Sequence, residues 1–142
     1  MFSNLKQLLV KAGWAPVSVL LVHNTISSVY GHKPGLDPPM HLLGGAAMAY
    51  FFYQVLTIWA TAFGKSKQLA RLVMAFCFAT TVAVFWEFIE FTGGELSGIS
   101  AQHSLRETMQ DLILGCTGAF IYLAINGALT WIIKRNKVED SS

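Results

Sequence analysis

The sequence predicts an all-α integral membrane protein, a bundle of four transmembrane helices with both termini in the cytoplasm. Of its 142 residues, 54% are hydrophobic and only 13% are charged, and the mean hydropathy is +0.49. These proportions are typical of membrane proteins rather than soluble ones. The connections between the apolar runs are too short to hold a soluble domain. We therefore expect a single transmembrane domain over residues 1–142, with spans at approximately residues 14–30, 39–63, 69–92 and 107–133.

The first run is the shortest and is interrupted by polar residues. A bilayer core of about 30 Å needs roughly 20 residues of helix, so this span is the least strongly marked. Its polar residues His23, Ser27 and Tyr30 share one helix face, which is either a packing stripe or a functional surface. A cleaved signal peptide is an alternative explanation of the run. The residues ahead of it are expected to form a basic amphipathic helix on the inner membrane surface.

The second run opens with a strong helix start. Asp37 is a preferred N-cap residue, and two prolines follow it. Capping accounts for Asp37, but His41 lies one turn deeper on the same face, where capping does not reach. Gly44, Gly45 and the alanines after them allow another helix to approach closely. His41 is therefore the residue in this run that calls for a functional explanation.

The third run carries two carboxylates, Glu87 and Glu90, which share a helix face because they lie three residues apart. A carboxylate at mid-membrane costs on the order of 2.5–3.5 kcal/mol on insertion scales, and less toward an end. Both glutamates are expected at the C-terminal end of a helix over 69–92, where the macrodipole disfavours negative charge. Thr80 and Ala83 on the same face indicate that it packs into the bundle. A partner for the glutamates is therefore expected elsewhere in the chain.

The fourth run begins with Ser104 and Glu107, which fit a capping box, so Glu107 has an ordinary structural explanation. Asp111 lies one turn deeper, and the capping box does not explain it. Gly115 follows Asp111 by four positions, as Gly45 follows a polar residue in the second run. We therefore expect the second and fourth spans to lie side by side and parallel, with the two glycines near their contact.

The basic residues predict the orientation. With a cytoplasmic N-terminus, only Lys33 and Arg106 of the ten basic residues lie outside, which is a clear positive-inside distribution. The net charge is only +2, and no nucleic-acid partner is expected. The eight basic residues on the inner side are Lys6, Lys11, Lys65, Lys67, Arg71, Lys134, Arg135 and Lys137.

The polar intramembrane residues gather at one end of this predicted bundle, its outer end. They could hold a divalent or di-metal centre, or share protons as a relay or general acid/base site, with Glu87, Glu90 and Asp111 catalytic. They could also be purely structural, with Arg106 as counter-charge. His23 and His103 could join the group. The six candidate metal ligands are Asp37, His41, Glu87, Glu90, Glu107 and Asp111.

The ordered motifs resemble those of a known family, the YjdF-type small bacterial inner-membrane proteins of unknown function. Ser104 stands where that family has an acidic residue. A more distant similarity, through His41, Glu87, Arg106 and Asp111, is to the VanZ-like membrane domains, which are associated with low-level glycopeptide resistance. The residues that carry the YjdF-type resemblance are Asp37-x-x-x-His41-x-x-x-Gly45, Trp86-Glu87-x-x-Glu90, Gln102 and Glu107-Thr108-x-x-Asp111.

Together these features predict a VanZ/YjdF-like envelope protein of the inner (plasma) membrane. Its outward-facing carboxylate/His pocket would bind a cation or a lipid-linked or anionic headgroup, with a divalent metal ion as the candidate cofactor. One alternative is a metal-dependent hydrolase or transferase acting on a lipid, and another is an accessory subunit of a membrane complex. An oligomer is compatible with the glycine-rich faces. The sequence has no Walker loop or CxxC pair that would decide among these functions.

Overall fold

The computed structural model describes residues 2–30, 37–60, 67–98 and 104–139, and these are almost entirely helical, with no strand among them. Four of the helices are long and apolar enough to cross a membrane, which confirms the predicted fold class. In chain order, the elements are α1 (Phe2–Leu8), the π-helical turn η1 (Leu9–Gly13), α2 (Trp14–Tyr30), α3 (Asp37–Ile58), α5 (Gln68–Ser97) and α6 (Leu105–Glu139).

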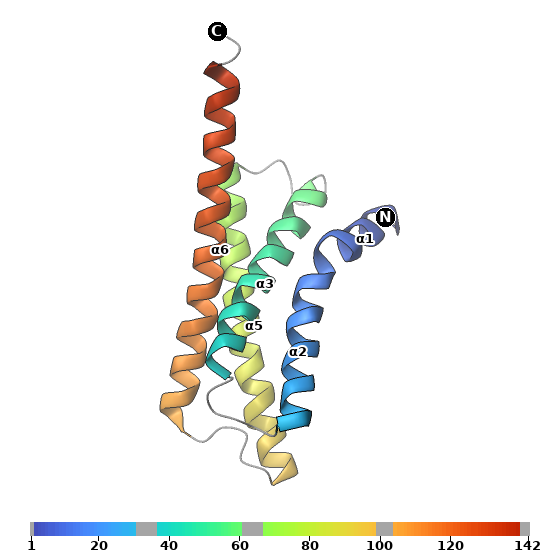
Figure 1. The fold of residues 1–142 in the computed structure, drawn as a ribbon, viewed down its shortest axis with the longest axis vertical. Coiled ribbons are helices and arrows are strands. Elements are labelled where there is room, and N and C mark those ends of the chain that lie inside the picture. The colour runs from blue at the N-terminus through green and yellow to red at the C-terminus, as the bar shows by residue number, and fades with distance from the viewer. Residues whose placement is uncertain (1, 31–36, 61–66, 99–103, 140–142) are drawn as a thin grey trace.

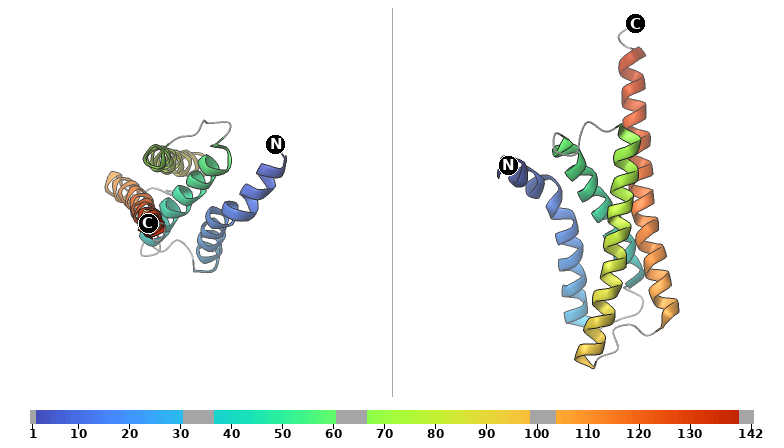
Figure 2. Two further views of the ribbon diagram at one scale, coloured as in Figure 1. Left: turned by 90° about the horizontal axis from the view of Figure 1, so that it is seen from above. Right: turned by 180° about the vertical axis from the view of Figure 1, so that it is seen from behind.

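The helices alternate in direction, so both termini lie at the same end of the bundle (Figure 1). Helices α3, α5 and α6 pack against one another, whereas α2 packs against α3 on the outside of this group (Figure 2). Which end faces the cytoplasm stays a prediction. The starts of α3 and α6 and the end of α5 lie at the opposite end of the bundle (Figure 1).

The first span begins earlier than the sequence suggested. Helix α1 continues through η1 into α2, and the segment apolar enough to cross the membrane is Leu5–Ile26 rather than 14–30. Figure 1 shows α1 bent away from the axis of α2, and the π-helical turn lies at this bend. The residues expected to form a separate surface helix therefore belong in part to the span itself.

The packed centre of the bundle is made of small side chains. Ala49, Ala75 and Ala119 are completely buried, with Tyr53 and Leu123 beside them. No large side chain is completely buried among the described residues. In lipid there is no hydrophobic drive to bring helices together, so close van der Waals packing of small residues has to do so.

The predicted contact between the second and fourth spans is confirmed, because α3 and α6 run parallel and touch through glycines. A Cβ added at Gly45 would overlap the carbonyl of Gly115, and one added at Gly118 would overlap the carbonyl of Leu42. The two backbones therefore lie in direct contact over about one helical turn, residues 42–46 of α3 and 115–118 of α6. Gly118 is a second point of contact that the pattern of polar residue plus glycine did not include.

The ends of three helices differ from the prediction. Helix α3 ends at Ile58, before the predicted end at 63, and residues 61–63 lie outside the described part of the chain. Helix α5 does not stop before Gly93 but continues to Ser97, and Gly98 ends it with a left-handed φ of 67°. Glycine within a helix costs only about 1 kcal/mol relative to alanine, which a long transmembrane helix can absorb. Helix α6 likewise runs six residues past the predicted end at 133, to Glu139.

Because α5 extends to Ser97, Glu87 and Glu90 do not lie in its last turn as predicted. Glu90 lies seven residues before the end of α5, and Glu87 lies ten residues before it. The macrodipole acts only over the last turn of a helix. It therefore does not destabilise these carboxylates, and burial is the cost that has to be offset.

Candidate functional site

Three of the six predicted ligands come together, each from a different helix. His41 on α3 lies between Glu87 on α5 and Asp111 on α6. Its Nδ1 is 3.8 Å from Oε1 of Glu87, and its Nε2 is 3.9 Å from Oδ2 of Asp111. One potential ligand atom from each of the three residues lies within 4.8 Å of the other two. We call these residues the triad.

The triad rests on a layer of small residues one helical turn away. Gly45, Ala83 and Gly115 each lie four residues from a triad member, on the side toward the middle of the bundle. The backbone contact between Gly45 and Gly115 holds α3 against α6, and a Cβ at Gly115 would lie 3.3 Å from that of Ala83. Because the three helices meet so closely at this level, the longer side chains above it converge.

The triad is shielded from its surroundings. The side chains of Glu87, His41 and Asp111 are 5%, 11% and 13% exposed, and Glu87 is the one buried charged residue in the described part of the chain. Buried charges need compensation by partners or bound ions. Within the triad, one imidazole can offset at most one of the two carboxylate charges. The arrangement is therefore suited to a cation or to a shared proton.

The other three predicted ligands surround the triad without joining it. Glu90 is partly buried, accepts a hydrogen bond from the Trp86 side chain and lies within electrostatic range of His41. Asp37 lies within such range of both Glu90 and Asp111. The third, Glu107, lies in the first turn of α6. The predicted cap by Ser104 is confirmed, because the backbone N–H of Glu107 donates to Oγ of Ser104 at 3.2 Å.

The remaining candidates take no part in the triad. Arg106, the proposed counter-charge, is exposed, and no ion pair joins it to a carboxylate in the described ranges. His103 lies outside the described residues. His23 on α2 instead meets the ring of Trp86 edge-on, with 6.5 Å between ring centroids. Trp86 was named in the YjdF-type motif but was not predicted as a site residue, and its spacing of four from Glu90 was the available signal.

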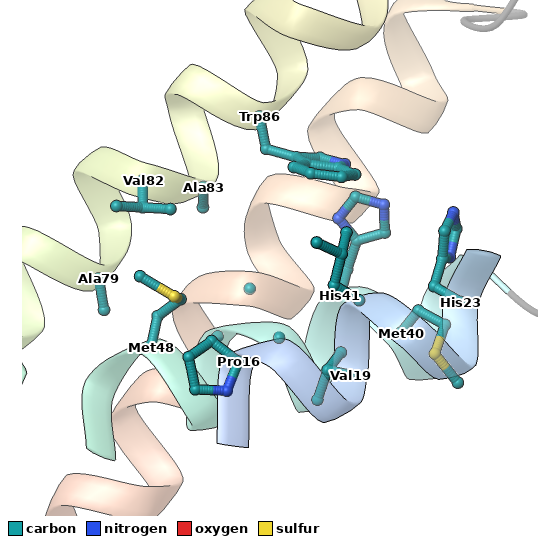
Figure 3. A pocket seen from close by; sticks show the side chains of 14 residues that line it. Pro16, Val19, His23, Met40, His41, Met48, Ala79, Val82, Ala83 and Trp86 are labelled. Atoms are coloured by element: carbon teal, nitrogen blue, oxygen red, sulfur yellow. The ribbon is translucent and has the colours of Figure 1, made fainter. Parts of the chain in front are cut away.

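A cavity of about 250 Å³ adjoins the triad between α2, α3 and α5. It differs from the carboxylate-rich pocket that we expected, because neither Glu87 nor Asp111 lines it. Figure 3 shows His41, Trp86 and His23 at one end, and mainly apolar side chains along the rest. His41 thus belongs both to the triad and to the cavity wall.

Comparison with known proteins places these features in context. The model of a family described as "Predicted membrane protein (DUF2238)" matches residues 9–131, a segment that contains the whole triad. A Thermotoga maritima protein called "Uncharacterized protein" is 31% identical over 101 residues, which cover 67% of this chain and 52% of that protein. The chain therefore spans about half the length of this relative. No solved structure matches the chain.

Proposed function

Since this chain belongs to the DUF2238 family of predicted membrane proteins, we propose that its function in the bilayer is carried by a cation centre formed by His41, Glu87 and Asp111. The observation that supports it is the convergence of three suitable donor atoms, from three helices, within 4.8 Å. Helical bundles build metal centres in this way, from side chains that project inward from facing helices.

The donor set selects the class of ion. Imidazole with carboxylates suits Zn²⁺, Mn²⁺ or Fe²⁺, and three protein ligands leave a position for water or substrate. With metal–ligand distances near 2.0–2.1 Å, tetrahedral ligands lie about 3.3 Å apart. Small rotations of the two carboxylates would bring the present donors to that spacing. A divalent ion would also offset carboxylate charge within the triad.

An open metal position next to an apolar cavity fits a lipid headgroup as the bound group. In the enzymatic form of this proposal, a metal-dependent hydrolase or transferase acts on a lipid. Glu90 would then be the general base, because the Trp86 N–H holds its partly buried carboxylate beside the triad. The likeness to VanZ-like domains stays a prediction.

A second candidate is favoured by the orientation of the imidazole. A metal takes one nitrogen of His41, whereas here each nitrogen faces a different carboxylate. That arrangement also suits transfer of a proton from Glu87 through His41 to Asp111, since imidazole can accept at one nitrogen and donate from the other. The two candidates differ in whether metal is bound.

Metal analysis of the purified protein separates them. We expect about one divalent ion per chain in the wild type and in Glu90→Gln, and much less in Glu87→Gln and Asp111→Asn. Glu90→Gln is the matched control, because it removes a neighbouring carboxylate from the same helix without touching the triad. Wild-type protein that holds no metal, and whose melting temperature does not respond to added Zn²⁺ or Mn²⁺, would reject the cation centre and favour proton transfer.

We also propose that the protein lies in the inner (plasma) membrane with the triad toward the outer face. In a background with Cys77→Ala and Cys116→Ala, Glu95→Cys should react with an impermeant maleimide in intact cells. Asn136→Cys near the end of α6 should react only after lysis. External labelling at position 136 would reverse the orientation and move the triad to the inner side.

A further inference from the structure

The first span is joined to the bundle on one side only. Helix α2 packs along α3, and within the described ranges its backbone does not come close to that of α5 or α6. The rear view in Figure 2 shows α2 set to one side of the other helices. The cavity of about 250 Å³ occupies the resulting space, so it is a groove bounded by α2 and α5 with α3 as its floor.

The groove has an apolar length and a polar end. The polar end is formed by His23, His41 and Trp86, and the edge-on contact of His23 with Trp86 bridges α2 and α5 there. Figure 3 places Pro16, Met48 and Ala79 toward the opposite end. The apolar lining is completed by Val19, Leu20, Met40, Val82 and Ala83.

The position of the groove restricts what can fill it. Its walls belong to helices that are apolar and long enough to cross the membrane. A buried water needs two to four polar partners, and the apolar length offers none. An empty groove would forfeit the dispersion contacts of every side chain that faces it. Hydrocarbon is the surrounding solvent at this depth, and the flexible side chains of Met40 and Met48 can adapt to it.

We propose that this groove binds one acyl chain of a bilayer phospholipid, with the head of the lipid at the end formed by His23, His41 and Trp86. An acyl chain gains little by leaving the bilayer for another apolar environment, so shape and the polar end have to select the occupant. The groove shares only His41 with the triad. The site therefore goes beyond the cation centre and does not require that a metal be bound.

Two substitutions on one helix test the site. Val82 lines the groove, whereas Val84, two residues further along α5, is 39% exposed on the outer surface of the bundle. Val82→Trp places an indole in the groove, and Val84→Trp places the same indole in the surrounding lipid or detergent. The probe is a phosphatidylethanolamine with a diazirine in one acyl chain, added to detergent-solubilised protein and cross-linked by light.

We expect saturable labelling of the wild type and of Val84→Trp, with cross-links on groove residues of α2 and α5. Labelling of Val82→Trp at a sub-saturating probe concentration should fall about tenfold or more. Equal labelling of the two variants, or cross-links spread evenly over the exposed helix faces, would overturn the proposal. Metal content should be the same in both variants, so failure of the cation centre would be distinguished from failure of the groove.

A second variant guards against misfolding of Val82→Trp. Gly44→Leu also fills the groove, and a Cβ at this position has room, since its nearest neighbour is Cγ1 of Val19 at 4.0 Å. If neither groove variant runs as a single folded species, native mass spectrometry of the wild type with the same probe decides. A one-to-one lipid adduct that survives removal of the detergent supports the site, and the absence of an adduct rejects it.

Discussion

Helix α3 packs directly against α6 on one side, whereas on its other side it forms the floor of the groove between α2 and α5. Toward α6, Gly45 and Gly118 bring two backbones into direct contact. On the other side, α2 and α5 face each other across the groove with branched side chains such as Val19 and Val82. Since apolar burial does not drive association within lipid, small residues decide where helices close. Where branched side chains of α2 and α5 face each other instead, the helices stay apart and hydrocarbon is left to fill the space.

The closed side also explains the precision of the triad. His41 and Asp111 each lie one turn from a glycine in the α3–α6 contact, so their backbones are fixed by that contact rather than by flexible side chains. A binding site needs its ligands held within about 0.5 Å of the productive geometry. The contact between α3 and α6 can supply this rigidity, whereas the open groove leaves room for an exchangeable ligand.

The largest effect should follow from opening the closed side. Gly45→Ala puts a Cβ against the carbonyl of Gly115, so the two helices have to move apart, and we expect a loss of about 1–3 kcal/mol or more in unfolding free energy. Thermal unfolding in one detergent, together with folded yield, measures this.

Gly44→Ala is the matched control for that variant. It changes the adjacent residue of the same helix in the same way, but its Cβ meets open space near Val19. Higher helix propensity should leave its stability unchanged or raise it by up to about 1 kcal/mol. Equal stability of the two alanine variants would contradict direct backbone contact between α3 and α6.

The second effect concerns the triad that rests on this contact. A cation bound at 100 times its dissociation constant stabilises the folded state by about 2.7 kcal/mol. Chelator should therefore lower the melting temperature of the wild type, and Glu87→Gln should melt near the chelated wild type whether or not chelator is present. Glu90→Gln should keep the response to chelator.

A different result would contradict the metal centre. If Glu87→Gln is destabilised, no metal is detected and chelator has no effect on the wild type, then the pair of Glu87 and His41 is the interaction that was lost. Removing one partner of a buried pair leaves the other uncompensated. That result would reject the metal and leave His41 as the group that stabilises the carboxylates.

The features that could be predicted from the sequence are those that a single segment, or a pair of matching segments, encodes. The four spans follow from the length of the apolar runs, and the contact of Gly45 with Gly115 follows from small residues at matching positions. Three of the six candidate ligands converge within 4.8 Å, and the sequence could not single them out, because the depth of Glu90 and Asp37 depends on the rotation and length of each helix. Metal binding by any of the six stays a prediction. Helix α5 continued through Gly93, which a local reading of glycine as a breaker does not anticipate.

The groove could not be predicted from the sequence for a different reason. It depends on the absence of a close approach between α2 and α5, which no single segment encodes. His23 was recognised as part of a polar stripe, but its partner Trp86 lies on another helix. Sequence patterns thus identified the closed side of α3 but not its open side.

The smallest effect should come from the one ring contact that bridges the groove. His23→Ala removes one ring of the His23–Trp86 pair. Such a pair contributes about 0.5–1.5 kcal/mol to stability beyond the area that it buries. Because α2 packs mainly along α3, we expect the free energy of unfolding to fall by an amount at the lower end of this range, as measured by thermal unfolding. Trp86→Phe keeps a ring opposite His23 but removes the N–H that Glu90 accepts, so comparing the two variants separates the ring contact from the hydrogen bond. A loss of several kcal/mol in His23→Ala alone would mean that α2 and α5 are held together by more than this contact, and the groove would then be a closed interface.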